Sequence, residues 1–239
     1  MHALWSLAIG HGDPHEPQQN HSRRIMIGIF GGTFNPIHFG HLRPALEITE
    51  ALPLQELRWV PSALPPHREE PEVDAQLRLQ MVKVAVLSEP RFRVDDRELR
   101  RPGPSYTVDT LESLRQELAT EPLALLIGMD AFLGLHTWHQ WSRLIEMAHL
   151  IVMQRPGVYS TAQYRQKMHP DVKALVDQHS VTDARQLHQL KSGKVWFHAV
   201  TQMANSATGV RRVIKSGHSA RYLTPDRVLE VIEHNRLYR

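Results

Sequence analysis

Two histidines three residues apart follow a pair of adjacent glycines near the start of the chain. Gly31 and Gly32 end an apolar run, and His38 and His41 come next, where a helix is expected to begin. In the first turn of a helix, residues three apart lie on one side, so both imidazoles would face the pocket beside the glycines. Imidazole N–H groups there would bind phosphate oxygens and stabilise charge that develops on phosphorus. The spacing therefore predicts phosphoryl-transfer chemistry by positioning, without a covalent intermediate.

The histidine pair alone is weak evidence, because the chain contains 16 histidines. His136 and His139 have the same spacing without a glycine turn, and two capping or packing histidines are the alternative explanation. The whole run GGTFNPIHFGH is more specific. It matches neither the GxxxxGK[ST] pattern of a P-loop nor the GxGxxG spacing of a dinucleotide-binding fingerprint. It predicts an anion site at the start of a helix, formed by Gly31, Gly32, Thr33 and Phe34.

A second group of phosphate-binding side chains is expected near the end of the chain. Ser206, Thr208 and Arg211 follow a predicted strand and open a predicted helix. Two hydroxyls, free backbone N–H groups and a guanidinium would then meet at one helix start, which suits a phosphate. The alternative is an ordinary serine cap with an arginine that faces solvent. In combination with the first glycine turn, we interpret the group as a second phosphate clamp.

The elements that position these residues alternate between strands and helices. Strands are expected at 25–30, 56–60, 92–94, 123–127, 150–153 and 194–200. Helices are expected after the first glycine turn, at about 75–87, at about 105–118, and twice at the end of the chain. This alternation predicts an α/β fold with a doubly wound, mostly parallel sheet. Its ligand would lie beyond the carboxyl ends of the strands, where every candidate residue falls.

Composition limits the domain organisation and the class of partner. The chain has 239 residues, 41% of them apolar, which predicts a single domain over 25–239 with a polar insertion around 159–192. Residues 1–24 have no hydrophobic period and are expected to be a disordered leader. No apolar stretch is long enough for a membrane span and cysteine is absent, so we expect a cytoplasmic protein with no membrane partner. Its scattered basic residues give a net charge of +3, which favours nucleotides over nucleic acid.

The run GGTFNPIHFGH resembles the signature of the nucleotidyltransferases that carry an HxGH motif and join a mononucleotide to AMP or CMP. That resemblance implies a Rossmann-like fold, with His38 and His41 as the catalytic pair. Asn35 stands where the usual pattern has aspartate, and we expect it to form the same local turn before Pro36. The segment from Ser206 to Arg211 is similar to the S-x-T-x-x-R motif with which this family holds the β- and γ-phosphates of ATP.

Three further stretches resemble the bacterial nicotinate-mononucleotide adenylyltransferases within that family. The segment 104–111, PSYTVDTL, is similar to the stretch whose helix start receives the nicotinate carboxylate, which implies roles for Tyr106 and Thr107. Trp138 matches the tryptophan that stacks on the pyridine ring. The loop PPHR implies that His67 approaches the phosphates, and the strand end GMD implies that Gly128 and Asp130 contact the adenosine side. The closing segments YLTP and NRLY resemble a structural helix of the same proteins.

The resemblance implies one reaction and leaves others open. It implies transfer of AMP from ATP to nicotinate mononucleotide, giving nicotinate adenine dinucleotide and pyrophosphate. Mg²⁺ would be carried by the ATP phosphates, and no metal site built from protein side chains is expected. The alternatives are transfer to nicotinamide mononucleotide or pantetheine phosphate, cytidylyl transfer, or a nucleotide-binding protein without catalysis. The sequence gives no indication of the oligomeric state.

Overall fold

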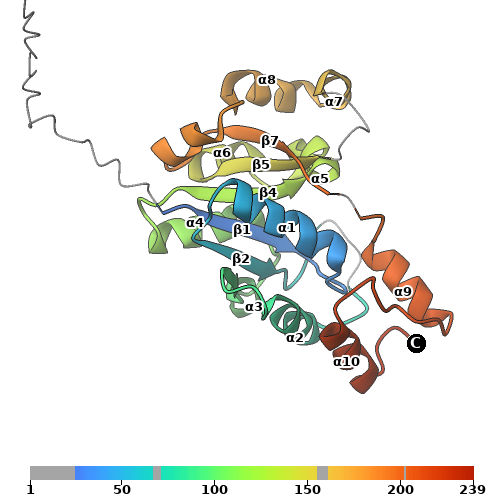
Figure 1. Cartoon of the computed structure of the whole chain (residues 1–239). Helices are drawn as coiled ribbons and strands as arrows, with labels where there is room; N and C mark the ends of the chain where they lie inside the picture. Colours follow the sequence, from blue (N-terminus) through green and yellow to red (C-terminus); the bar gives the residue numbers. More distant parts are fainter. Residues whose placement is uncertain (1–24, 67–70, 155–160, 202) are drawn as a thin grey trace, which may run out of the picture.

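Seven parallel strands form one sheet in the computed structural model, which describes residues 25–66, 71–154, 161–201 and 203–239. Their order across the sheet is β3-β2-β1-β4-β5-β7-β6, and every described pairing is parallel (Figure 1). The strands are β1 (Ile27–Gly32), β2 (Glu56–Pro61), β3 (Phe92–Val94), β4 (Leu123–Gly128), β5 (His149–Gln154), β6 (Ser180–Val181) and β7 (Val195–Ala199). The predicted doubly wound α/β fold is therefore confirmed.

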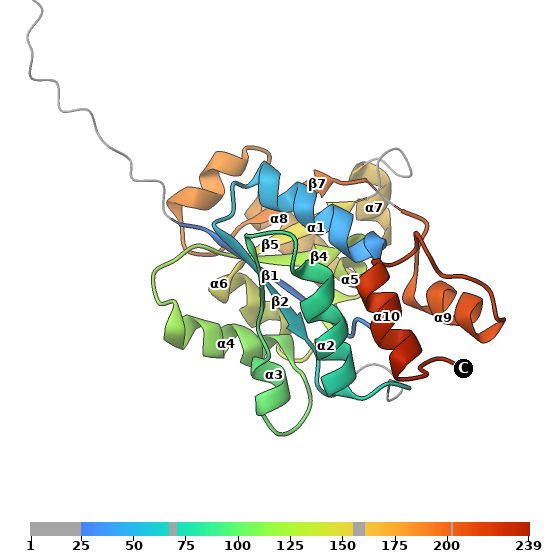
Figure 2. The ribbon, with the colours of Figure 1, turned by 60° about the horizontal axis from the view of Figure 1, so that its bottom comes forward.

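Helices cover both faces of the sheet. Buried side chains of α1 (Phe39–Ala51), α2 (Ala75–Val86), α9 (Ala207–Lys215) and α10 (Asp226–His234) belong to one core cluster. Those of α4 (Thr107–Glu117), α5 (Met129–Leu133), α6 (Leu144–Met147), α7 (Thr161–Lys167) and α8 (Pro170–His179) belong to the other. Figure 2 shows α2 and α10 side by side on the first face, and the two helices are in contact. The strands supply both clusters because successive side chains point to opposite faces.

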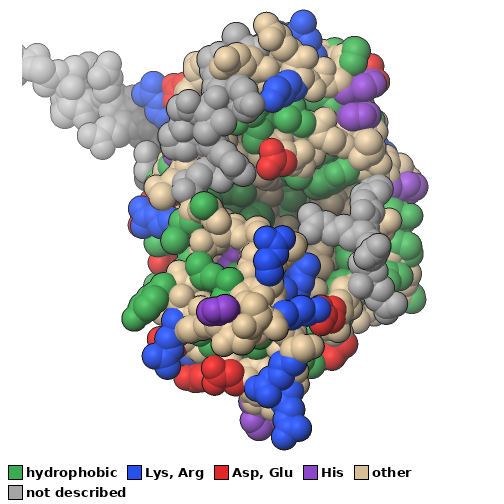
Figure 3. All heavy atoms as spheres, turned by 90° about the vertical axis from the view of Figure 1, so that its right-hand side faces the viewer, with side chains coloured by type: hydrophobic (Ala, Val, Ile, Leu, Met, Phe, Trp, Pro, Cys, Tyr) green, Lys and Arg blue, Asp and Glu red, His purple; other side chains and the backbone are tan. Residues whose placement is uncertain are grey.

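The chain changes direction across the sheet between β1 and β4. From β1 it runs outward through β2 to β3, and it then returns to form β4 on the other side of β1. In an open α/β sheet, ligands bind beyond the carboxyl ends of the strands at such a point. Figure 3 shows the face toward which these strands run: it is hollowed at its centre, and Lys and Arg side chains gather below the hollow. The fold therefore places a candidate anion-binding crevice where β1 and β4 end.

The first strand extends two residues further than the sequence suggested. Gly31 and Gly32 are inside β1, where they pair with Val60 and Pro61 of β2. The expectation that these glycines turn the chain is wrong, because neither has a positive φ and the left-handed residue of the turn is Phe34, with φ 47°. A Cβ on Gly32 would lie 2.9 Å from the Phe34 ring. Gly32 is thus needed for the close approach of that ring.

The described part of the polar segment 159–192 contributes to the core. It forms α7, α8, β6 and the 3-10 helix η3 (Ala184–Gln189). Tyr164, Val172 and Val176 are buried in the core cluster that also contains residues of β4 and β5, and Leu187 is buried in the other cluster. From the sequence we expected only a polar insertion here, because these apolar residues are widely spaced among charged ones. The predicted leader, 1–24, lies outside the described residues, and no described helix is long and apolar enough to cross a membrane.

Candidate active site

The turn from β1 into α1 brings the two predicted catalytic histidines together. The His38 and His41 rings stack with their centroids 3.8 Å apart and an angle of 27° between their planes. The Phe34 ring meets the His41 ring edge-on at 5.2 Å, so the side chain of the left-handed residue packs against the histidine pair. Apolar packing on one side leaves little freedom for the imidazoles to rotate. The geometry is that of a preorganised pair of hydrogen-bond donors.

A backbone hydrogen bond selects the tautomer of a neutral His41 ring. The His38 backbone N–H donates to His41 Nδ1 at 3.3 Å, within the first turn of α1. A neutral imidazole that accepts at Nδ1 carries its proton on Nε2. His41 is therefore held in the tautomer that can donate from Nε2 to an oxygen of a bound phosphate.

His38 is buried, with 5% of its surface exposed. Burial lowers the pKa of its imidazole from 6.5 to about 4, so the ring is neutral near pH 7. Its Nδ1 is buried and has no hydrogen-bond partner among the described residues. An unpartnered polar atom of this kind is costly unless a ligand or water satisfies it. Since Nδ1 is not accessible from the surface, a bound phosphate would have to meet this ring at Nε2.

The low pKa of His38 predicts how stability depends on pH. The unfolded chain binds a proton at this histidine at a higher pH than the native protein does, so stability falls as the pH drops from about 6.5 toward about 4. His38 accounts for up to about 3 kcal/mol of that fall. Burial of His149 acts in the same direction by lowering its pKa, so the wild type must be compared with His38→Gln. Urea unfolding across this range should show a flatter profile for the variant; identical profiles would contradict a neutral, buried His38.

Gly40, between the two histidines, is required by close packing. A Cβ at this position would lie 2.9 Å from Cε1 and Nδ1 of His38 and 3.1 Å from the backbone oxygen of Asn205. Distances this short are not tolerated, so a larger residue must displace the His38 ring. We did not predict a role for Gly40 from the sequence, although it lies within the HxGH run. The glycine lets the start of α1 pack directly against the segment before α9.

Replacement of Gly40 by alanine is expected to lower kcat by at least about tenfold, because displacement of a reacting group by a fraction of an ångström is enough for this loss. Gly134→Ala is the matched control, since its Cβ would meet its nearest neighbour, the Ala131 oxygen, at an ordinary 3.7 Å. Steady-state kinetics of both variants would test this. Equal activity of Gly40→Ala and Gly134→Ala would show that His38 needs no such close contact.

The second predicted clamp contacts the first through Arg211. Its Nη1 donates to the backbone oxygen of Asn35 at 2.7 Å, and its Nη2 donates to Thr208 Oγ1 at 3.3 Å. Ser206 caps α9, where its Oγ accepts a hydrogen bond from the Gly209 N–H at 3.0 Å. Ser206 is thus the ordinary helix cap that the alternative expected, whereas Arg211 is half-buried and bonds to Asn35 instead of facing solvent. Although 176 residues separate them, the start of α9 and the turn after β1 form one surface.

Arg211→Ala is expected to raise the KM for ATP by about tenfold and the KM for the second substrate by much less. A tenfold increase in the KM for ATP is the size of effect expected from the loss of one charge-assisted hydrogen bond to phosphate. Arg211→Lys should recover part of the loss, because lysine keeps the charge but not the planar fork. Initial rates with each substrate varied in turn would separate the two KM values. Equal increases in the two KM values would show that Arg211 does not bind the triphosphate of ATP.

The C-terminal segments hold the same turn from behind. Thr224 Oγ1 donates to the Ile37 backbone oxygen at 2.7 Å, and the Tyr238 hydroxyl donates to Asn35 Oδ1 at 2.5 Å. Burial raises the pKa of Tyr238, which keeps the hydroxyl protonated as a donor. The Asn35 side chain therefore bonds to the end of the chain, whereas we had expected a local side-chain turn. The structural role expected for the closing segments is borne out, with the catalytic turn as the part they support.

The residues predicted to bind the mononucleotide lie at the start of α4 and after β4. Tyr106 caps α4 and its ring lies 4.3 Å from that of His139, while Thr107 is the first residue of the helix. Trp138 is half-buried against the core cluster beneath α4. Gly128 ends β4 and Asp130 lies in the first turn of α5. His67 lies outside the described residues.

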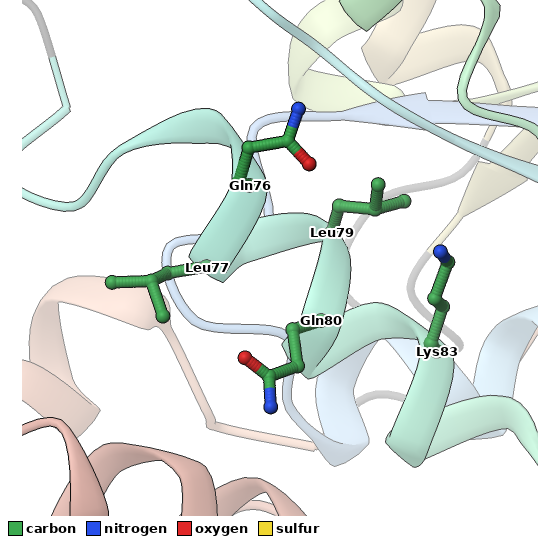
Figure 4. Close-up of a pocket in the computed structure, with 5 residues that line it drawn as sticks. All are labelled: Gln76, Leu77, Leu79, Gln80 and Lys83. Atoms are coloured by element: carbon green, nitrogen blue, oxygen red, sulfur yellow. The ribbon is translucent and has the colours of Figure 1, made fainter.

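A separate surface hollow of about 310 Å³ lies along α2 (Figure 4). Its lining consists of Gln76, Leu77, Leu79, Gln80 and Lys83, all from one helix. None of these residues is among the predicted site residues, and the side chains do not converge on a common point. The hollow therefore offers no chemistry of its own. Within the described residues, no group of three or more His, Cys, Asp or Glu side chains could hold a metal ion.

Comparisons with known proteins give one family. Residues 29–213 match the family described as cytidylyltransferase-like. A protein of Methylococcus capsulatus named "probable nicotinate-nucleotide adenylyltransferase" is 49% identical over 214 residues, which cover 89% of this chain and 99% of that protein. A protein of the same name from Pseudomonas syringae pv. tomato is also 49% identical, over 89% of this chain and 93% of its own length.

Among solved structures, the Plasmodium falciparum nicotinic acid mononucleotide adenylyltransferase complexed with NaAD has the same fold. The TM-score is 0.68 at 14% identity, over 90% of this chain and 97% of that one. At this identity the likeness shows the fold alone. The sequence identity to the bacterial proteins is high enough to show the family. This chain belongs to the cytidylyltransferase-like family and, within it, to the nicotinate-nucleotide adenylyltransferases.

Proposed function

We propose that this protein transfers AMP from ATP to nicotinate mononucleotide, giving nicotinate adenine dinucleotide and pyrophosphate. The observation that carries the proposal is the joining of two phosphate clamps at one turn, where Arg211 bonds to the turn that holds the His38 and His41 pair. Relatives at 49% identity carry the name of this activity, which supports the choice of substrates.

The reaction needs positioning more than a reactive side chain. The phosphate of the mononucleotide is already an anion and attacks the α-phosphorus of ATP in line, so the P–O bond to pyrophosphate breaks as the new P–O bond forms. His41, fixed as an Nε2 donor, and the buried His38 would stabilise the charge on the α-phosphate oxygens. The β- and γ-phosphates of the leaving group would be held by Ser206, Thr208 and Arg211. The α-phosphate would be held by the backbone at Gly31, Gly32, Thr33 and Phe34. ATP would enter as its Mg²⁺ complex.

The start of α4 supports an acidic pyridine ring as the other substrate. The Tyr106 N–H donates to the Pro104 oxygen at 3.1 Å, so the carboxylate would be received by the helix dipole and by the N–H groups from Thr107 onward, in the first turn of α4. Trp138 directly precedes His139, whose ring lies against Tyr106, and it would supply an aromatic face for the pyridine ring. Gly128 and Asp130 at the end of β4 lie at the switch point of the sheet, which suits contact with adenosine. A cytoplasmic location stays part of the proposal.

A pyrophosphate-release assay with a panel of acceptors tests the proposal. Each reaction contains MgATP with nicotinate mononucleotide, nicotinamide mononucleotide or pantetheine phosphate, and a parallel set replaces ATP with CTP. We expect release with ATP and nicotinate mononucleotide to exceed every other combination. Preference for pantetheine phosphate or for CTP would place the chain in another branch of the family, and no release with any acceptor would support nucleotide binding without catalysis.

A further inference from the structure

A buried guanidinium lies beneath the two loops that flank the proposed site. Arg78, on α2, is 1% exposed, and its side chain donates to four backbone carbonyls. No carboxylate forms an ion pair with it among the residues that the structure describes. Burial of an unpaired charge is unfavourable, and an apolar side chain of similar size would avoid that cost. The positions of the four acceptors indicate which parts of the structure this arginine connects.

The acceptors belong to three separate segments of the chain. Nη1 donates to the Thr33 oxygen at 2.8 Å and to the Ser62 oxygen at 2.7 Å. Nη2 donates to the Ala63 oxygen at 3.0 Å, and Nε to the Val73 oxygen at 3.1 Å. Thr33 is in the turn after β1, and Ser62 and Ala63 follow β2. Because the guanidinium is planar and its donors have fixed directions, it fixes the orientation of these peptide groups relative to one another.

The orientation of the carbonyls determines where the N–H groups point. In a trans peptide the C=O and N–H bonds point in opposite directions, so the N–H of Phe34 points away from Arg78. The N–H groups of Ala63 and Leu64 likewise point away and donate to Ser105 Oγ, at 2.9 and 3.2 Å. Ser105 directly precedes the start of α4. A continuous set of hydrogen bonds therefore runs from the phosphate-binding turn through Arg78 and the loop after β2 to the helix that faces the mononucleotide.

We propose that Arg78 is a positioning residue that fixes the ATP-binding turn relative to the start of α4, so that the two bound substrates meet in line. The inference rests on the proposed function and extends it to a residue that touches neither substrate. Each half-site is built from its own backbone and keeps its affinity when the connection is lost. The consequence of losing the connection is therefore a lower kcat, with smaller changes in the two KM values.

Arg115 provides a matched control within the same fold. Its guanidinium also donates to four backbone carbonyls, those of Met147, Leu118, Glu121 and Lys191. These acceptors precede β4, β5 and β7, at the amino ends of the strands and therefore at the edge opposite to the candidate site. Burial lowers the pKa of both arginines. The two residues share their donor and acceptor pattern; Arg78 is buried and Arg115 half-buried, and they lie at opposite edges of the sheet.

The test compares Arg78→Lys with Arg115→Lys in the full-length protein. For each variant, the melting temperature, kcat and both KM values are measured well below the melting temperature. We expect both substitutions to lower the melting temperature. Arg78→Lys should in addition lower kcat about 10²-fold, as expected for misaligned reactants, while Arg115→Lys keeps kcat within about twofold. An Arg78→Lys variant with kcat within about threefold of the wild type, or equal losses of kcat in both variants, would overturn the positioning role.

Two substitutions of Ser105 keep the proposal testable if Arg78→Lys does not fold. Ser105→Ala removes the acceptor of the Ala63 and Leu64 N–H groups, and we expect it to lower kcat about tenfold. Ser105→Thr restores a hydroxyl and should recover most of that loss. Wild-type activity in Ser105→Ala would refute the connection. The wild type in the same assay tests the proposed function separately: if it turns over while the variants are unaffected, only the role of Arg78 fails, and if it does not turn over, both proposals fail.

Discussion

His41→Ala is expected to lower kcat by about 10²-fold or more, with a similar loss for His38→Ala. Each imidazole is proposed to donate to an oxygen whose charge grows in the transition state, and removal of one such donor has an effect of this size. The two rings stack with 3.8 Å between their centroids, so we expect both to reach the same phosphate. Since the two act together, the double variant should lose less than the product of the single losses.

Pre-steady-state or steady-state kcat values, with a thermal unfolding curve for each variant, would check this result. His234→Ala is the control, because His234 is an exposed residue in the last turn of α10. Its kcat should be unchanged. If His38→Ala and His41→Ala both keep near-normal turnover while remaining folded, the histidine pair does not stabilise the transition state and the catalytic assignment is wrong.

The second large effect concerns the choice between nicotinate and nicotinamide mononucleotides. We expect kcat/KM for the acid to exceed that for the amide by at least about 10²-fold, which is the range that one mismatched polar group in a buried site produces. The acid differs by a full negative charge, which the helix start at Tyr106 and Thr107 favours. Asp109 is the acidic residue in the first turn of α4, and it lies 3.8 Å from the Arg101 guanidinium; we do not assign it to the N–H₂ group of an amide.

Two variants divide that preference into its parts. Trp138→Ala should weaken the binding of both mononucleotides about equally, because stacking depends on the ring and not on its substituent. Thr107→Val should reduce the difference in kcat/KM between the acid and the amide, because it removes a hydroxyl at the helix start. Kinetics with both substrates would measure these effects. Comparable efficiencies with the acid and the amide in the wild type would overturn the substrate choice, although adenylyl transfer would stand.

Much of the fold and site could be predicted because the signals are local. The strand-to-helix alternation predicted the parallel sheet, and the run from Gly31 to His41 predicted that the two histidines lie together; the structure confirms both. Anion binding at this turn stays a prediction. The position of the turn was wrong by two residues, since Phe34 rather than a glycine adopts the left-handed conformation. Packing of its ring against Phe30 and His41 supports that conformation, and packing of this kind has no signature in local sequence.

The residues that the sequence did not reveal act over long separations. Tyr238 bonds to Asn35 across 203 positions, and Arg78 bonds to Thr33 across 45. In the sequence, Arg78 is one charged residue in an amphipathic helix, where a solvated side chain is the ordinary expectation. Its burial depends on where the ends of β1 and β2 lie after the sheet has formed. Such a role can be identified once tertiary structure is known.

Phosphorus NMR of one complete reaction tests the central claim most directly. The purified protein is mixed with MgATP and nicotinate mononucleotide, and the ATP, pyrophosphate and dinucleotide resonances are followed with time. We expect pyrophosphate and nicotinate adenine dinucleotide to appear in equal amounts, and neither to appear when the mononucleotide is omitted. Hydrolysis of ATP without dinucleotide, or no consumption of either substrate, would contradict it.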